Sequence, residues 1–193
     1  YYSQCRPFLK LVLWTMNLTK HTVICDLDGT IADLSHRLHY IKNDNGEIKE
    51  SPDWAAFEKA CIDDKPIDDV IQIVKLLWSG DQTHTTPIRN LKFFTGRSNS
   101  VREITENWLR RYFFRVSRGS KEQEDIYSEF GVTLTMRHEN DYREDDQVKL
   151  EMMKYFGLKP DNVLCIFEDR QSVVDMWSRH GYRVLQISNC RFS

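Results

Sequence analysis

Short, mostly apolar runs alternate with longer stretches of helical periodicity, and this alternation restricts the fold more than any other feature of the sequence. Such runs are typical of strands that are buried on both faces. Strands that alternate with helices form a parallel sheet. The predicted strands are Thr22–Cys25, Leu91–Phe94, Val132–Met136, Val163–Phe167 and Arg183–Ile187. The predicted helices are Asp53–Cys61, Ile67–Trp78, Ser98–Arg111, Asp146–Phe156 and Ser172–His180.

The predicted fold class is therefore α/β, a Rossmann-like parallel sheet of about five strands that is covered by helices on both faces. Ser98 and Ser172 stand where helix N-caps are expected, and Gly157 and Gly181 stand where helices are expected to end. Residues 34–80 are too many for one crossover connection, so they predict a small helical insert after the first strand. Ligands of such folds bind at the carboxyl ends of the strands.

The chain has 193 residues, which is enough for one ordinary domain. We expect this domain to cover residues 20–193, after an N-terminal extension of residues 1–19 in which Met16 is a plausible original start. The apolar run Phe8–Trp14 is expected to pack against protein rather than to enter a bilayer. Residues 117–130 are polar and charged, which predicts an irregular surface excursion.

Composition excludes several classes of protein. The 27 basic and 29 acidic residues give a formal net charge of −2, which excludes a uniformly basic nucleic-acid coat protein. No apolar run approaches the ~18–20 residues of a membrane helix, so no membrane association is expected. The five cysteines are scattered and form no CxxC pair, which argues against a zinc knuckle or a disulfide framework. We therefore expect a reduced, cytoplasmic protein.

The first predicted strand leads directly into Asp26-Leu-Asp28-Gly29-Thr30. Two carboxylates at a spacing of two leave a strand on the same side. An ionised aspartate can attack phosphorus, while a second one, kept protonated by its surroundings, can donate to the leaving oxygen and later activate water. Thr30 can donate to an anion or hold the turn. The alternative is an ordinary strand-to-turn connection, which we consider much the weaker interpretation.

Later strand ends carry further polar groups. Thr95 and Gly96 end the second strand, where a hydroxyl group can contact phosphate or simply belong to an N-cap region. Lys149 follows the start of a helix and can balance phosphate charge or remain solvated. Glu168 and Asp169 follow a buried strand, where two acids are costly unless they are paired or bind metal. With Asp26 and Asp28 in the chain, metal ligation is the favoured interpretation.

The four motifs Asp26/Asp28, Thr95, Lys149 and Glu168/Asp169, in this order along the chain, resemble those of the haloacid dehalogenase superfamily of phosphohydrolases. The resemblance is closer to the 3′-phosphatase domain of bacteriophage polynucleotide kinase/phosphatases and spans about residues 20–192. The segments that carry this closer match are His36-Arg37, Thr95-Gly-Arg97, Asp145-Asp-Gln-Val-Lys149, Glu168-Asp-Arg-Gln-Ser-Val-Val-Asp-Met-Trp177 and Gln186–Phe192.

The resemblance implies a role for each matching residue. Asp26 would be the nucleophile and Asp28 the general acid and base. Thr95 and Lys149 would hold the phosphoryl group. Mg²⁺ would be the cofactor. Its implied ligands are Asp26, the carbonyl of Asp28, Asp169 and, as a further candidate, Glu168. Arg37, Arg97 and Asp145 match positions that serve the substrate or the active site. Thr30 and Gly96 are further substrate-binding candidates, which come from the residues themselves.

The sequence departs from this branch in three respects. Position 168 is Glu where the branch usually has Asp, so Asp169 is given priority as a metal ligand. Segments 80–90 and 113–131 are longer than the branch requires. No GxxxxGK[ST] loop is present, so we expect no 5′-kinase domain in this chain.

The local charges conflict on whether the substrate is a nucleic acid. From Arg97 to Lys121 there are seven bases and two acids, with Tyr112, Phe113 and Phe114 among them, a pattern that can bind phosphates and stack on bases. The alternative is that these aromatic residues belong to the core and the arginines are solvated. From Asp44 to Asp69 there are nine acids and three lysines, a segment that would repel a polyanion and restrict access.

Three functions remain open from the sequence. The leading one is a Mg²⁺-dependent phosphomonoesterase that removes 3′-phosphate from a DNA or RNA end, within a bacterial host if the chain is encoded by a bacteriophage. The second is a phosphatase for free nucleotides or other small phosphate esters. The third, of a different class, is a non-catalytic binding or assembly subunit that keeps the fold. The oligomeric state is not predicted.

Overall fold

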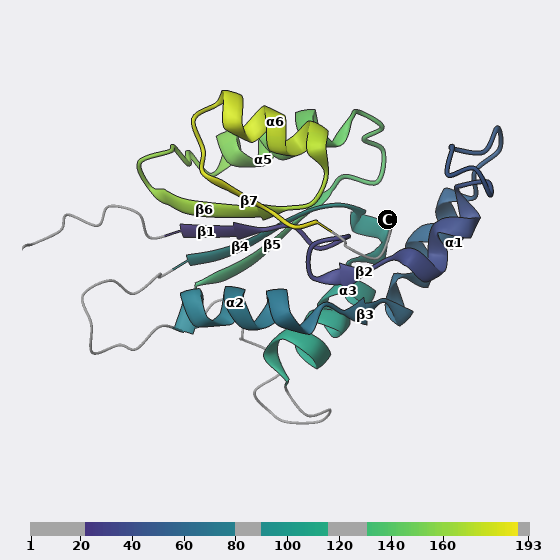
Figure 1. Ribbon diagram of the computed structural model, residues 1–193, viewed down its shortest axis with the longest axis horizontal. Coiled ribbons are helices and arrows are strands. Elements are labelled where there is room, and N and C mark those ends of the chain that lie inside the picture. Colours follow the sequence, from purple (N-terminus) through teal and green to yellow (C-terminus); the bar gives the residue numbers. More distant parts are fainter. Residues whose placement is uncertain (1–21, 80–89, 116–130, 189–193) are drawn as a thin grey trace, which may run out of the picture.

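The computed structural model describes residues 22–79, 90–115 and 131–188. Five parallel strands form the central sheet in the order β5-β4-β1-β6-β7 (Figure 1). This arrangement confirms the predicted fold class. The strands are β1 (Thr22–Cys25), β4 (Asn90–Ser98), β5 (Val132–Arg137), β6 (Val163–Glu168) and β7 (Val184–Gln186).

The central strands end together at one edge of the sheet. Cys25 of β1 pairs with Phe93 of β4 and with Phe167 of β6, so the residues that follow these three positions emerge side by side. Strand β4 continues to Ser98, four residues beyond the prediction. The prediction stopped early because the run becomes polar after Phe94, although the backbone continues to pair with β5.

Alternate residues of β1 point into two separate cores, as expected for a strand covered on both faces. Val23 packs with the apolar residues of α2 (Asp68–Ser79) and with Trp108 of α3 (Arg102–Trp108). Ile24 packs on the opposite face with α5 (Asp145–Tyr155) and α6 (Gln171–Arg179). Figure 1 shows these two helical layers below and above the sheet. The protein therefore has a buried core on each face of the sheet.

The predicted helix ends were only partly correct. Gly157 and Gly181 follow α5 and α6 with φ values of 60° and 82°, which confirms both predicted helix ends. Ser98 caps a short 3₁₀ turn, η3 (Asn99–Val101), by accepting from Ser100 N at 3.2 Å. The prediction for Ser172 was wrong, because α6 begins at Gln171 and Arg170 holds the extended N-cap position.

An insert stands at the carboxyl edge of the sheet, on the right of Figure 1. It contains the 3₁₀ helices η1 (Ser35–Tyr40) and η2 (Ala60–Asp63) and the α-helix α1 (Trp54–Lys59). The strands β2 (Ala32–Asp33) and β3 (Lys65–Pro66) form an antiparallel pair at its base, which the sequence did not predict. Helix α2, although within the expected range 34–80, packs on the main sheet through Val70, Ile71 and Val74.

Several predicted segments lie outside the described residues: the N-terminal extension, the excursion at 117–130 and most of the segment 80–90. Within the described ranges, no helix combines the length and the apolar character needed to cross a bilayer.

Candidate active site

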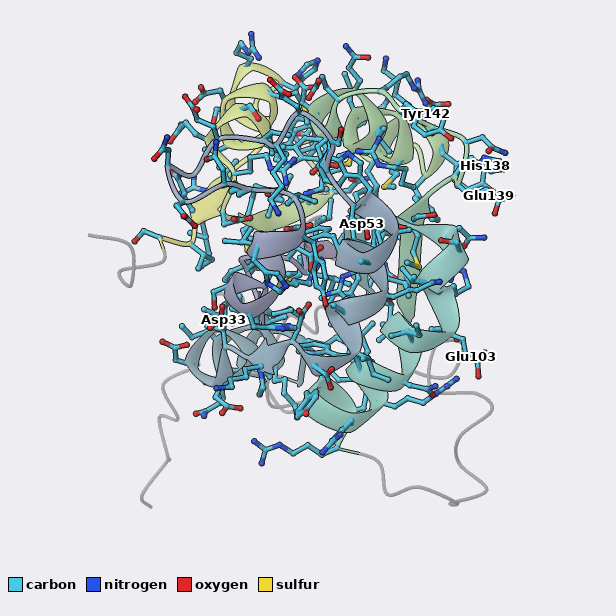
Figure 2. All side chains as sticks on the ribbon, turned by 90° about the vertical axis from the view of Figure 1, so that its right-hand side faces the viewer. Asp33, Asp53, Glu103, His138, Glu139 and Tyr142 are labelled. Carbon is cyan, nitrogen blue, oxygen red and sulfur yellow. The ribbon has the colours of Figure 1, made fainter. Side chains whose placement is uncertain are left out.

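A buried ion pair lies at the carboxyl end of β1. Figure 2 shows the molecule from the side that carries the carboxyl edge of the sheet. Asp26 directly follows the strand and is buried. Lys149, from the first turns of α5, donates from Nζ to Asp26 Oδ1 at 2.8 Å and to Glu168 Oε2 at 2.8 Å. All three side chains are almost inaccessible to solvent. One ammonium group therefore bridges two carboxylates that come from neighbouring strands.

Burial and charge act against one another in this ion pair. Burial raises the pKa of Asp26 to about 7, although Lys149 opposes the shift. Burial also raises the pKa of Glu168, again against Lys149. Burial alone would lower the pKa of Lys149, but Asp26 and Glu168 outweigh it and raise that pKa. The ammonium group therefore stays charged, and its two acid partners compete for its positive charge.

A third carboxylate completes an acidic trio. Oxygen atoms of Asp26, Glu168 and Asp169 all lie within 4.8 Å of one another. Burial, together with the charge of Asp26, raises the pKa of Asp169 to about 6. Thr30 Oγ1 lies 3.5 Å from Asp26 Oδ2 and 3.4 Å from Asp169 Oδ1, so its hydroxyl group can donate to either carboxylate. Carboxylate oxygens are the ligands that Mg²⁺ prefers, and three of them beside one ammonium group suit a divalent cation.

Gly29 permits the close approach of Asp169. Its φ value is 83°, and a Cβ atom at this position would overlap the Asp169 carboxylate. The Asp-x-Asp-Gly turn therefore requires glycine both for its left-handed backbone and for the space occupied by the third acid.

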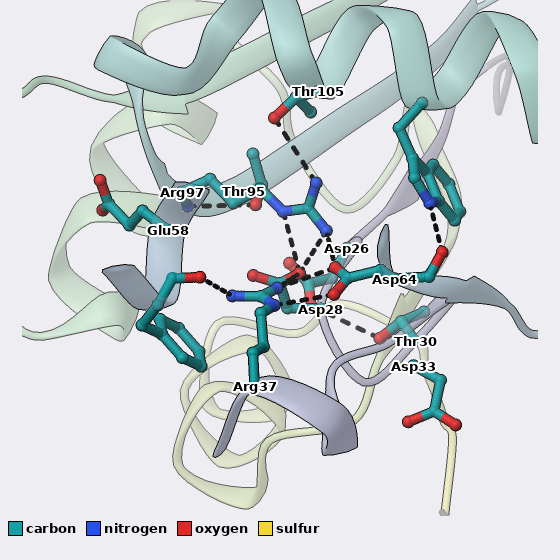
Figure 3. Close-up of polar contacts among 12 residues, drawn as sticks. Asp26, Asp28, Thr30, Asp33, Arg37, Glu58, Asp64, Thr95, Arg97 and Thr105 are labelled. Carbon is teal, nitrogen blue, oxygen red and sulfur yellow. Dashed lines mark hydrogen bonds and ion pairs between the residues drawn. The ribbon is translucent and has the colours of Figure 1, made fainter. Parts of the chain in front are cut away.

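The second aspartate of the motif lies in a cluster of guanidinium groups (Figure 3). Asp28 Oδ1 accepts from Arg37 Nη2 at 2.6 Å, and from Arg97 Nε at 2.9 Å and Nη2 at 2.5 Å. Burial would raise the pKa of Asp28, but Arg97 and Arg37 outweigh it, and the pKa is lowered. The expectation that its surroundings keep this aspartate protonated is not met by these contacts.

Asp64 connects the same two arginines from the insert and was missed by the sequence analysis. Its carboxylate accepts from Arg37 Nε at 2.8 Å and Nη2 at 2.9 Å, and from Arg97 Nη2 at 2.7 Å. His36 Nε2 lies 3.0 Å from Asp64 Oδ1, and the Asp64 carbonyl accepts from Trp108 Nε1 at 2.7 Å. Asp64 is fully buried. In the sequence it is one of nine acids in the acidic segment, and no local pattern separates it from the exposed ones.

The end of β4 contributes a second group of predicted residues. The hydroxyl of Thr95 is buried and accepts from Arg97 N at 3.2 Å. A Cβ atom at Gly96 would overlap the Asp145 carboxylate, so β4 and α5 meet closely here. Asp145 accepts from Arg137 Nη2 at 2.7 Å, and Arg137 Nε donates to the carbonyl of Gly96 at 3.0 Å. Arg137 was not singled out from the sequence, because its contact with Gly96 joins two strands that are distant along the chain.

Within residues 97–115, the aromatic side chains of the arginine- and aromatic-rich stretch pack into or against the core. Phe113 is fully buried in the core, and Tyr112 and Phe114 pack partly against it. Arg102 and Arg110 both pair with Glu106 on their own helix, at 3.2 Å and 3.8 Å. Within residues 97–115, the core position of Phe113 agrees with the alternative interpretation, whereas Arg97 is buried beside Asp28 rather than solvated. Arg118 and Lys121 lie outside the described residues.

The parallel sheet, with the acidic trio at its carboxyl edge, has a haloacid dehalogenase-like fold. In agreement, a haloacid dehalogenase-like family hydrolase from Streptococcus pneumoniae has the same fold, with a TM-score of 0.54 and 14% identity over 88% of this chain and 85% of that one. A family model described as the polynucleotide kinase PNKP phosphatase domain matches residues 20–192. The chain belongs to this family.

Two relatives are larger than this chain. A putative bifunctional polynucleotide kinase/RNA ligase of Autographa californica nuclear polyhedrosis virus is 31% identical over 155 residues, which cover 80% of this chain and 17% of that protein. A chain in the structure of a Pnkp1/Rnl/Hen1 complex has a TM-score of 0.59 and 25% identity, over 90% of this chain and 48% of that one. These comparisons establish the family without assigning the sequence to a bacteriophage.

Proposed function

We propose that this chain is a Mg²⁺-dependent phosphomonoesterase that removes the 3′-phosphate from DNA or RNA ends through a phospho-aspartate at Asp26. The observation that carries the proposal is the position of the Asp26 carboxylate, which is held by Lys149 within a trio of acids at the carboxyl edge of the sheet. A carboxylate in such a position can act as a nucleophile, while the ammonium group offsets the charge of an incoming phosphoryl group.

The donor set fits a divalent cation, because three carboxylates converge within 4.8 Å. Asp26 and Asp169 would hold Mg²⁺, with Glu168 and the carbonyl of Asp28 as further candidate ligands. When bound, the ion supplies positive charge to the phosphoryl oxygens. Both carboxylate oxygens of Glu168 already accept hydrogen bonds, Oε2 from Lys149 Nζ at 2.8 Å and Oε1 from Arg170 N at 3.3 Å, so we give Asp169 the larger part in metal binding.

The chain's own groups account for the two chemical steps. In the first, a bond forms between an Asp26 oxygen and phosphorus, the ester P–O bond breaks, and Asp28 donates a proton to the leaving oxygen. In the second, the Asp28 carboxylate takes a proton from water, which attacks phosphorus and releases phosphate and Asp26. Arg37 and Arg97 oppose the protonation that Asp28 needs in order to act as an acid. We expect the negative charge of the phosphoryl group to draw one of these guanidinium groups away from Asp28, which allows that protonation.

The other predicted positions act on the substrate side. Lys149 balances the phosphoryl charge, and the hydroxyl groups of Thr95 and Thr30 lie at strand and turn positions from which they can donate to phosphoryl oxygens. Gly96 and Asp145 fix the approach of β4 to α5, with Arg137 connecting them.

Family membership supports a nucleic-acid end as the substrate. The viral relative is named a putative bifunctional polynucleotide kinase/RNA ligase, and the structure that is 25% identical is that of a Pnkp1/Rnl/Hen1 complex. The viral name describes activities on polynucleotides. We therefore infer that kinase and ligase steps, where they accompany this reaction, belong to other domains or chains.

A phosphatase for free nucleotides or other small phosphate esters is the second candidate. It is favoured by the insert, which stands at the carboxyl edge and contributes Arg37 and Asp64 to the site. An insert in this position restricts access for long substrates.

The test is phosphate release with Mg²⁺ from matched oligonucleotides that carry either a 3′- or a 5′-phosphate, beside a panel of mononucleotides. We expect the 3′-phosphorylated strand to be preferred by about a hundredfold or more in kcat/KM, which is roughly 2.7 kcal/mol of transition-state discrimination. Preference for mononucleotides would support the second candidate. No turnover of any ester would indicate a non-catalytic subunit.

A further inference from the structure

An exposed indole stands on the insert that also carries Arg37. Trp54 is the first residue of α1, and its side chain is 51% exposed. The preceding residue, Asp53, caps α1 by accepting from Ala56 N at 2.9 Å, and its own backbone N donates to Tyr40 O at 3.1 Å. Figure 2 places Asp53 near the centre of the face that carries the active site. The backbone at Trp54 is thus anchored while its ring is half open to solvent.

Two ring contacts connect Trp54 to the active site. Its ring meets the Phe57 ring edge-on, with 5.9 Å between the centroids. The guanidinium carbon of Arg37 lies 4.2 Å from the centroid of the Phe57 ring, and Arg37 Nη1 donates to the Phe57 carbonyl at 3.3 Å. Arg37 in turn donates to Asp28 at 2.6 Å. Two side chains, Phe57 and Arg37, therefore connect the indole to Asp28.

The charge of the surrounding segment restricts what this indole can contact. Residues 44–69 contain nine acids and three lysines, so they repel the phosphates of a nucleic-acid backbone. A nucleobase is uncharged and can stack on an aromatic ring regardless of its sequence. When a nucleic-acid strand approaches the insert, the acidic residues therefore favour contact with a base over contact with a phosphate.

We propose that Trp54 is a stacking platform for a nucleobase close to the 3′-phosphate, and that it determines the preference for nucleic-acid ends over esters that lack a base. This inference rests on the proposed function. Trp54 touches none of the reacting groups, so it acts on binding, and its effect falls on KM rather than on kcat.

The experiment compares two 3′-phosphorylated oligonucleotides with the full chain. One has normal bases throughout, and the other is abasic at its last three positions. Wild type is expected to bind the normal strand about tenfold more tightly, as measured by KM, because stacking on an aromatic ring contributes on that order. Trp54→Ala should lose this preference, and Trp54→Phe should retain most of it.

Tyr155→Ala is the matched control, because Tyr155 is 80% exposed and lies at the opposite end of α5 from Lys149. It should keep the preference of wild type. A Trp54→Ala variant that keeps the preference, or that loses kcat equally on both strands, overturns the inference while leaving the proposed function intact. If wild type releases phosphate from small esters and from neither oligonucleotide, the proposed function fails, and the inference fails with it.

Discussion

Lys149 Nζ lies 2.8 Å from Asp26 Oδ1, and neither side chain has appreciable access to solvent. The same ammonium group is bonded to Glu168. Removing one charge from this buried group would leave its partners unpaired. Lys149, which is proposed to balance the phosphoryl charge, therefore also contributes to the stability of the fold.

Replacement of Lys149 by Met should therefore affect stability as well as rate. Removing one member of a buried ion pair costs about 3–5 kcal/mol, because the acids that remain are unpaired. For a chain of this size that lowers Tm by roughly 10 °C or more. Scanning calorimetry and phosphate release measure both effects. Lys154→Met, an exposed lysine on the same helix, is the control, and equal behaviour of the two variants would contradict the account.

Asp64 provides a second test of the buried charges. Asp64→Ala leaves Arg37 and Arg97 with Asp28 as their remaining carboxylate in the cluster shown in Figure 3, and we expect a loss of about 3–5 kcal/mol in the free energy of unfolding. Turnover should also fall, because both guanidinium groups then concentrate on Asp28 and oppose its protonation. The neighbour Asp63 is exposed, so Asp63→Ala should change neither quantity measurably. Similar denaturation curves for the two variants would show that Asp64 has no special role.

Alanine substitutions at Gly29 and Gly46 distinguish the effect of backbone strain from the effect of displacing the Asp169 carboxylate. Gly29→Ala and Gly46→Ala both place alanine at a positive φ, 83° and 81°, so the backbone penalty is similar. Only at Gly29 would the added Cβ overlap the Asp169 carboxylate, whereas nothing lies within 4 Å at Gly46. We expect Gly29→Ala to lose Mg²⁺-dependent turnover and Gly46→Ala to keep it. Equal loss in both variants would mean that strain alone is responsible.

Mg²⁺ should stabilise the protein, and more strongly at higher pH. The pKa values of Asp26 and Asp169 are raised to about 7 and about 6, so in acid these carboxylates carry protons that compete with the metal. The rise in Tm on adding Mg²⁺ should therefore be larger at about pH 8 than at about pH 5.5. Asp169→Asn should abolish the rise. A Tm shift that is independent of pH, or one that persists in this variant, would place the ion elsewhere.

The features that could be predicted from the sequence are those that depend on local patterns of residues. Buried apolar runs identified the strands, and Gly157 and Gly181 marked two helix ends, because both signals act within a few residues. The pairing of Asp64 with Arg37 and Arg97 was not predictable, since it joins the insert to β4 through the folded chain. Strands β2 and β3 have two residues each, too few to show a period. The three acids of the trio were among the predicted metal ligands because they stand at the carboxyl ends of β1 and β6, which lie side by side.

The most direct test of the account is to trap the phosphorylated enzyme. Wild type and Asp26→Asn are mixed with a 3′-phosphorylated oligonucleotide and Mg²⁺, quenched in acid within the first turnover and digested for mass spectrometry. Asp26→Asn preserves shape and can still accept from Lys149, so it should fold normally and release no phosphate. The account predicts one added phosphoryl group on the wild-type peptide that contains Asp26, and none in the variant. A phosphoryl group on another residue, or wild-type turnover in the variant, would contradict it.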